Sequence, residues 1–126
     1  MMRNGLSEIN KLVGVWGSFI SNNRGEVMLN VTPPQLKDPV LEDISQQVLE
    51  LINSSSDNLK DLSEMTFHFS QRVLLVVDLE KAILTVVCTP GVDLPLLRMT
   101  VNVVRTDWDE DEKVQRYLEK NFLERI

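Results

Sequence analysis

The chain opens with apolar residues at helical spacing. They are Leu6, Ile9, Leu12 and Val13, and they follow a short polar start. Residues three and four positions apart share one face of a helix, so this spacing predicts a first helix of about two turns. We expect Gly14 to end it.

The pattern then changes to that of a β-hairpin. Residues 15–21 are rich in aromatic and β-branched side chains, which predicts a strand. In residues 27–32, Val27, Leu29 and Val31 alternate with Met28, Asn30 and Thr32, and this period of two predicts the returning strand. Between them, Asn22–Gly25 has the residue types that tolerate positive φ in tight turns. Pro33 and Pro34 end the second strand, because proline donates no hydrogen bond to a sheet.

A second helical period follows. Its apolar face consists of Val40, Leu41, Ile44, Val48, Leu51 and Ile52. Asp38 ahead of Pro39 predicts an N-cap followed by proline at the first helical position. The polar segment 53–57 ends this helix in a loop, and the pattern leaves open whether residues 58–62 add another helical turn.

Three strands come next. Met65, Phe67 and Phe69 alternate with polar residues, so the first of these strands has one apolar and one polar face. Residues 72–79 and 82–89 are almost continuously apolar, which is typical of strands covered on both faces. The turn between them, at residues 78–81, is short enough for a hairpin.

A helix with two apolar sides is predicted after residue 93. One stripe consists of Leu94, Leu97, Val101 and Val104. A second consists of Leu96, Met99 and Val103. Because packing on a single layer needs only one apolar stripe, we expect this helix to be covered on more than one side.

The tail from Thr106 onward is predicted to be either a separate helix or a kinked continuation of the preceding one. Asp107 and Glu110 fit a capping box at its start. Acidic residues near that start and basic residues further on match the helix dipole. Its apolar stripe consists of Val114, Tyr117, Leu118 and Phe122.

These elements follow the order α-β-β-α-β-β-β-α, with an additional helix at the C-terminus. Five strands joined mostly by hairpins predict a single five-stranded antiparallel sheet with flanking helices, which is an α+β fold. A chain of 126 residues has the length of one domain. We place that domain at residues 1–105 and a C-terminal helical extension at residues 106–126.

Charge and cysteine content argue against several kinds of partner. The net charge is −6 and the 13 basic residues are scattered singly, whereas binding to nucleic acid or anionic membrane needs clustered Lys and Arg. The longest apolar run, Val73–Val77, is far shorter than the ~20 residues of a membrane span, so no direct membrane insertion is expected. Cys88 is the single cysteine, so no intrachain disulfide can form, and we expect a cytoplasmic protein.

No group of residues indicates catalysis. His68 is the single histidine and Cys88 ends an apolar strand, and structural roles are favoured for both. The acidic run at residues 107–112 lacks the glycine-containing loop of calcium sites, and Gly14–Gly17 lacks the Gly-Lys-Ser/Thr ending of a phosphate loop. We therefore expect no enzyme, cofactor or metal site. For Trp108, packing of the last helix is favoured over an interface role.

The order and spacing of five segments carry a resemblance to a known family. These segments are Leu12–Val15, Asn23–Gly25, Leu75–Asp78, Ala82–Val87 and Asp93–Arg98. In this arrangement the chain resembles the roadblock/LC7 superfamily, which includes dynein light chains and Ragulator-type subunits, from about Leu6 to Val104.

The resemblance implies a dimer with a second copy of the chain or with a related roadblock chain. In this superfamily the middle helix and the third strand of each protomer meet, and one sheet extends across both. The corresponding positions here are Ile44, Val48, Leu51, Met65, Phe67 and Phe69. The sequence agrees with edge pairing, since residues 65–70 contain no lysine or proline that would block it.

The resemblance also implies regulation or scaffolding of a small Ras-like GTPase. It assigns no catalytic residue to this chain. The candidate partner surface is the polar side of the middle helix, formed by Glu42, Gln46, Gln47 and Glu50. An ordinary solvated face explains the same residues.

Two other functions compete with this one. A small-molecule sensor would hold its ligand between sheet and helix, in a pocket with convergent polar groups. An enzyme would need a base, nucleophile or metal within reach of one another. The sequence leaves open whether a GTPase is activated, inhibited or tethered, and what the last helix does.

Overall fold

The computed structural model describes residues 2–54 and 64–123 of the chain. Its helices and strands are α1 (Met2–Asn10), β1 (Val15–Ser21), β2 (Val27–Val31), α2 (Asp38–Ser54), β3 (Glu64–His68), β4 (Val73–Asp78), β5 (Ile83–Cys88), α3 (Leu94–Glu110) and α4 (Glu112–Leu123). This order confirms the predicted succession of elements and the additional C-terminal helix. The possible helical turn at residues 58–62 lies outside the described residues.

All five strands form one sheet in the order β2-β1-β5-β4-β3. Every neighbouring pair is antiparallel, which confirms the predicted α+β fold with a five-stranded antiparallel sheet. The central pair joins distant parts of the chain, because Val15 of β1 lies opposite Cys88 of β5. Of the described strands, β2 and β3 are therefore the two edges of the sheet.

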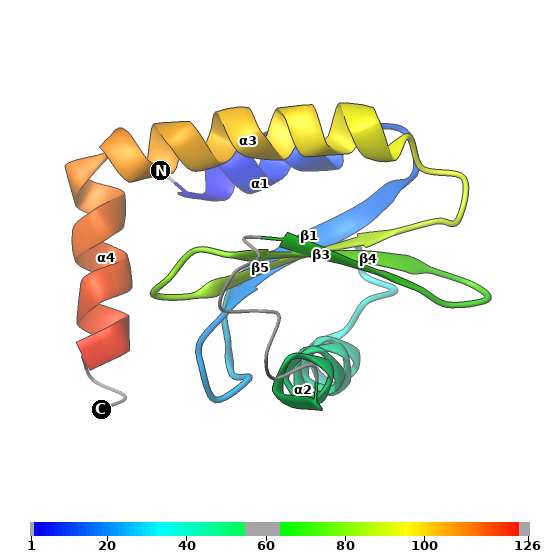
Figure 1. The fold of residues 1–126 in the computed structure, drawn as a ribbon, viewed down its shortest axis with the longest axis horizontal. Coiled ribbons are helices and arrows are strands. Elements are labelled where there is room, and N and C mark those ends of the chain that lie inside the picture. Colours follow the sequence, from blue (N-terminus) through cyan, green and yellow to red (C-terminus); the bar gives the residue numbers. More distant parts are fainter. Residues whose placement is uncertain (1, 55–63, 124–126) are drawn as a thin grey trace.

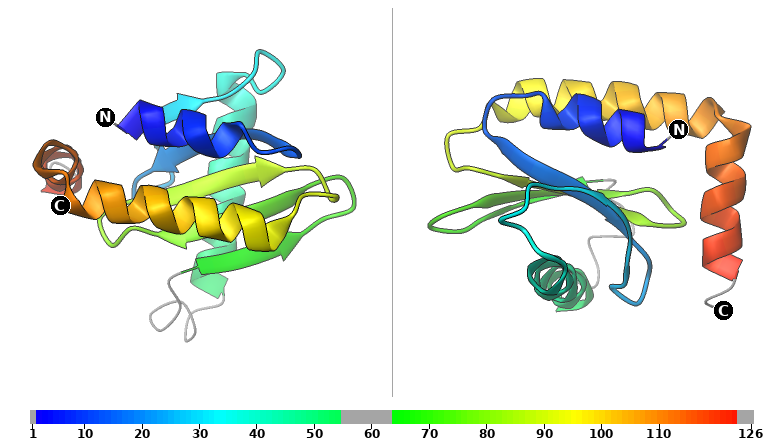
Figure 2. Two further views of the ribbon diagram at one scale, coloured as in Figure 1. Left: turned by 90° about the horizontal axis from the view of Figure 1, so that it is seen from above. Right: turned by 180° about the vertical axis from the view of Figure 1, so that it is seen from behind.

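Helices cover both faces of this sheet. α1 and α3 lie side by side on one face, and α2 crosses the strands on the other (Figures 1 and 2). Side chains alternate across a strand, so the central strands supply both cores. Leu75 and Leu84 are buried on the side of α1 and α3, whereas Leu74 and Val87 are buried with α2. This explains why β4 and β5 are almost continuously apolar.

The turn between β1 and β2 forms as its residue types predict. Gly25 has a φ of +78°, a value that glycine adopts without steric cost. The side-chain oxygen of Asn22 accepts hydrogen bonds from the N–H groups of Arg24 at 2.8 Å and Glu26 at 3.1 Å. At the other end of β2, α2 begins at Asp38, and the Leu41 N–H donates to the Lys37 carbonyl at 3.1 Å.

The first helix ends earlier than predicted. α1 stops at Asn10, and Gly14 lies beyond it in the turn into β1, with a φ of +93°. Leu12 donates its N–H to the Ile9 carbonyl at 3.2 Å, which closes a tight turn rather than a further α-helical turn. The side chain of Val13 is 95% exposed, so it does not belong to the apolar face of α1.

The break before the last helix comes at Asp111, and the predicted capping box at Asp107 is wrong. α3 continues to Glu110 because Trp108 extends its buried stripe by one more turn. The carboxylate of Asp111 then accepts hydrogen bonds from the N–H groups of Lys113 at 2.9 Å and Val114 at 3.3 Å, which caps α4. The tail is therefore a separate helix, set at an angle to α3 (Figure 1).

Only one of the two apolar sides of α3 is covered. Leu97, Val101 and Val104 are buried as predicted. The second side is exposed, with exposed fractions of 46% for Leu96, 66% for Met99 and 63% for Val103. The expectation of a helix covered on more than one side is wrong for the part of the chain that the structure describes, because α1 lies beside α3 rather than above it (Figure 2).

Candidate interaction surface

In the described part of the chain, β3 is one of the two edge strands of the sheet. Among the described residues, β3 pairs only with β4. Where this hairpin closes, the Phe69 N–H donates to the Arg72 carbonyl at 2.9 Å. Phe69 and Arg72 thus form a hydrogen-bonded pair at the end of the ladder.

This pair determines which backbone groups of β3 point outward. Hydrogen-bonded and non-hydrogen-bonded pairs alternate along an antiparallel ladder, so every second residue of β3 binds β4. The remaining residues direct their N–H and C=O groups away from the sheet. In the observed register these are Glu64, Thr66 and His68.

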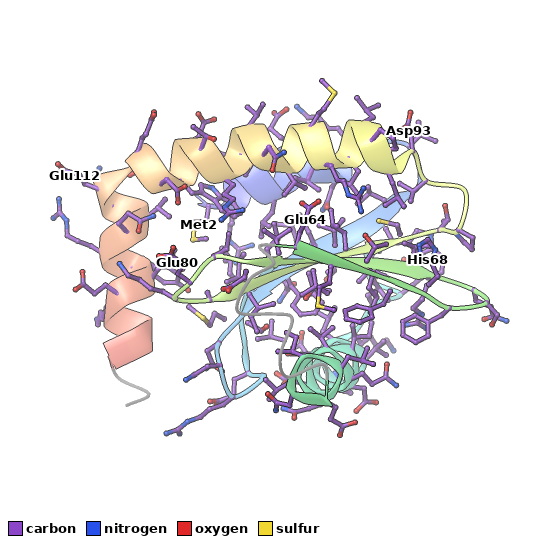
Figure 3. The ribbon with its side chains drawn as sticks, viewed as in Figure 1. Met2, Glu64, His68, Glu80, Asp93 and Glu112 are labelled. Carbon is purple, nitrogen blue, oxygen red and sulfur yellow. The ribbon has the colours of Figure 1, made fainter. Side chains whose placement is uncertain are left out.

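Arg98 of α3 fixes two of these side chains. Its Nε lies 3.0 Å from the Glu64 carboxylate, and its terminal nitrogen donates to the Thr66 hydroxyl at 3.0 Å. Glu64, Thr66 and, by alternation, His68 therefore lie on the α3 side of the sheet. Figure 3 shows Glu64 and His68 toward opposite ends of β3.

On the other side of the sheet, a groove separates α2 from the β3–β4 turn. It has a volume of about 390 Å³. Val40, Asp43 and Gln47 line it from α2, and Phe69 and Arg72 line it from the turn. The groove combines apolar side chains with one carboxylate and one guanidinium, and it adjoins the end of β3.

The structure divides the six predicted interface residues into two groups. Ile44 and Val48 are only 2% and 1% exposed, because the sheet already covers this face of α2. Leu51, Met65 and Phe67 are half-buried, and Phe69 is 43% exposed. Phe69 follows the last residue of β3 and belongs to the turn.

The four predicted partner-surface residues do not form one patch. The side chain of Gln46 donates to the Arg24 carbonyl at 3.2 Å and so holds the β1–β2 turn. Gln47 lies on another flank of α2, in the groove beside Phe69. Glu50 is exposed between these flanks, on the side of α2 that is turned away from the sheet, whereas Glu42 is exposed on the flank toward β2, where it lines a recess with Val27 and Asn30.

Trp16 is an exposed aromatic residue whose exposure sequence reasoning missed. The register between β1 and β5 shifts between Val15 and Gly17, so Trp16 is the extra residue of a β-bulge. Its side chain is 46% exposed and borders a recess of about 370 Å³ with Pro33 and Leu36. A bulge depends on the pairing of distant strands, so the local pattern carries no signal for it.

The two candidate reactive side chains, His68 and Cys88, lie apart from each other. His68 is exposed at the end of β3, whereas Cys88 is buried at the end of β5. Burial raises the pKa of the Cys88 thiol to about 12, so this thiol is protonated at neutral pH and a poor nucleophile.

The acidic run and Trp108 occupy the corner between α3 and α4. Within residues 2–54 and 64–123, no cluster of three or more His, Cys, Asp or Glu side chains is placed to hold a metal ion. Trp108 is 4% exposed and packs in the core.

Across the same described ranges, no helix has both the length and the apolar character needed to cross a membrane.

The sheet order and the placement of the helices define the class of fold. A five-stranded antiparallel sheet with α1 and α3 on one face and α2 on the other is the fold of roadblock/LC7 domains, and the chain has this fold. The predicted roadblock/LC7-like fold is therefore confirmed.

Three solved structures illustrate the likeness. A roadblock/LC7 domain from Streptomyces avermitilis has a TM-score of 0.65 and 13% identity, over 91% of this chain and 95% of that one. The gliding protein MglB from Thermus thermophilus has a TM-score of 0.70 and 16% identity, over 94% of this chain and 89% of that one. An MglB with a tetrameric arrangement has a TM-score of 0.72 and 16% identity, over 94% of this chain and 88% of that one. No protein-family model matches the sequence, and neither does any curated protein.

Proposed function

We propose that this chain is a non-catalytic interaction module that dimerises through β3 and α2 and regulates or scaffolds a small Ras-like GTPase. The observation that carries the proposal is the edge of β3, which pairs only with β4 among the described residues. Natural sheets usually protect such an edge with charge, proline or a covering element, because it pairs readily with another strand. Here the outward backbone groups are accompanied by half-buried Met65 and Phe67 and by exposed Phe69.

The proposed dimer interface combines this edge with the adjoining flank of α2. Met65, Phe67 and Phe69 meet the partner directly, together with Leu51 of α2. Ile44 and Val48 act indirectly, since their burial against the sheet fixes the position of α2. The tetrameric arrangement of a structurally similar MglB supports self-association as a use of this fold.

The proposed GTPase-binding surface is the exposed part of α2, including Glu42 and Glu50. α2 contains four acidic residues and no lysine or arginine. A surface with one sign of charge accelerates encounter with a partner of the opposite sign. The GTPase that fits it therefore presents a patch of Lys and Arg.

Light scattering coupled to size exclusion tests the dimer. We expect the full chain to be a dimer at micromolar concentration and the Thr66→Pro variant to be a folded monomer. Proline at position 66 removes an N–H that points away from β4, so the β3–β4 hairpin keeps its hydrogen bonds. Phe69→Asp, which charges an exposed side chain, is expected to act in the same direction.

Met99→Asp is the matched control, because Met99 is an exposed apolar residue of α3 that is not part of the proposed interface of β3 and α2. It should remain a dimer. A monomeric wild-type chain would reject the dimer and bring forward the small-molecule sensor as the alternative function.

Binding to GTPases tests the second half of the proposal. Purified small Ras-like GTPases, loaded with GDP or with a non-hydrolysable GTP analogue, are tested for binding to the full chain at low and high salt. We expect a complex that weakens at high salt and with Glu42→Lys, while Glu119→Lys on α4 leaves it unchanged. The rate of GTP hydrolysis in the same mixtures distinguishes activation, inhibition and tethering. Binding that is equally tight at low and high salt and with Glu42→Lys would contradict the proposed surface.

A further inference from the structure

The sequence of β3 is complementary to itself when it is reversed. It consists of Glu64, Met65, Thr66, Phe67 and His68. We propose that two copies of this chain pair their β3 strands in antiparallel fashion, with Thr66 opposite the partner's Thr66. This inference rests on the proposed dimer and adds to it the register of the two strands and the identity of the partner, a second copy rather than a related chain.

The backbone restricts the possible registers. The outward groups belong to alternate residues, so pairing about a two-fold axis must place one outward residue opposite another. Axes at Met65, Thr66 or Phe67 satisfy this condition. An axis at Thr66 pairs every residue of β3 with a residue of the partner's β3. Moving the axis to either neighbour shifts the strands by about two residues and places one end of β3 beyond the end of the other strand.

Charges on the α3 side favour the same axis. With Thr66 at the centre, Glu64 lies opposite the partner's His68, and His68 lies opposite the partner's Glu64. The Glu64 carboxylate then lies between Arg98 of its own chain, 3.0 Å away, and an imidazole that donates a hydrogen bond to it. The two-fold axis generates this contact twice. Opposite polar partners directly across a ladder stabilise pairing, whereas like charges weaken it.

The α2 side is complementary in shape and polarity. The same axis places Met65 opposite the partner's Phe67, and both side chains are half-buried in the single chain. A thioether beside an aromatic ring is a favourable contact. The two sides of the strand therefore prefer one register, and a related chain would need this same residue pattern to match it.

Disulfide cross-linking of the full-length chain tests the register. Directly opposite residues have Cα atoms roughly 4.5–5.5 Å apart, within the range of a disulfide, whereas a shift of two residues separates them by about 7 Å or more. Under mild oxidation, we expect Thr66→Cys to form a covalent dimer by itself. Met65→Cys and Phe67→Cys should not cross-link alone but should cross-link to each other when mixed. The unchanged chain is the control for Cys88, which is buried.

Other cross-linking patterns have distinct meanings. Self-cross-linking of Met65→Cys or of Phe67→Cys would move the axis to that residue and overturn the register. Dimers by light scattering without any cross-link would place the interface elsewhere and also overturn it, while self-association would stand. A monomeric wild-type chain would remove the proposed dimer and the register together.

Charge variants at His68 provide a second test without cross-linking. His68 is exposed, so its replacement leaves the core intact. We expect His68→Glu to weaken the dimer about tenfold, because a carboxylate then faces the partner's Glu64 at each of the two symmetry-related contacts, and His68→Lys to retain it. Equal dissociation constants for the two variants would contradict the proposed contact between Glu64 and the partner's His68.

Discussion

Thr85 is a polar residue enclosed by the apolar core beside α2. It is fully buried in β5, and its neighbours directly across the ladder are Phe19 of β1 and Val76 of β4. Its hydroxyl finds no hydrogen-bond partner among the described residues. A buried hydroxyl without a partner lowers stability by about 1–3 kcal/mol, since the water that it bonded in the unfolded chain is not replaced.

We therefore predict that Thr85→Val stabilises the fold. The change replaces the hydroxyl by a methyl group of similar size, and we expect a gain of about 1 kcal/mol in the free energy of unfolding, or an increase of roughly 4 °C in Tm. Thr32→Val is the matched control, because the Thr32 hydroxyl donates to the Asn30 side chain at 3.2 Å. It should lower stability. Urea unfolding followed by circular dichroism measures both, and a destabilised Thr85→Val would show that the hydroxyl is satisfied.

Most elements of the fold could be predicted because their signals are local. The strand at Val15–Ser21 has the predicted bounds, since its aromatic and β-branched residues and the turn that follows it lie within a few positions of one another. The end of α3 could not be predicted in this way. Asp107 and Glu110 match a local capping pattern, but burial of Trp108 against α1 keeps the helix intact through them. A tertiary contact thus overrides a local preference worth about 1 kcal/mol.

The candidate surface was predictable only in part, for a related reason. Alternation identified Met65 and Phe67 as one face of a strand, and the absence of lysine and proline indicated an open edge. Periodicity also identified the apolar face of α2, but it cannot say whether a sheet or a partner covers that face. In the structure, Ile44 is buried against the sheet, whereas Val40 is 36% exposed and lines the groove.

The two ends of the described chain contribute to one core. Trp108 packs against Gly5 so closely that a Cβ at position 5 would lie 2.8 Å from the indole. Val114 and Leu118 of α4 are buried in the same cluster as Met2 and Leu6 of α1. The predicted boundary between residues 105 and 106 falls inside α3, upstream of all three of these C-terminal core residues.

Truncation tests whether residues 1–105 form a domain without the tail. We predict that a chain ending at Arg105 loses most of its stability, because it lacks Trp108, Val114 and Leu118 and uncovers α1. Burial of each such side chain contributes about 1.5–3 kcal/mol, against a typical total of about 5–15 kcal/mol for a domain.

A chain ending at Glu110 keeps Trp108 and should be intermediate between the chain ending at Arg105 and the full-length chain. Circular dichroism at increasing urea measures all three without relying on the fluorescence of Trp108. Equal midpoints would show that residues 106–126 are an independent extension. The predicted order, with the chain ending at Arg105 least stable, would mean that α4 is part of the fold on which the β3 edge is built.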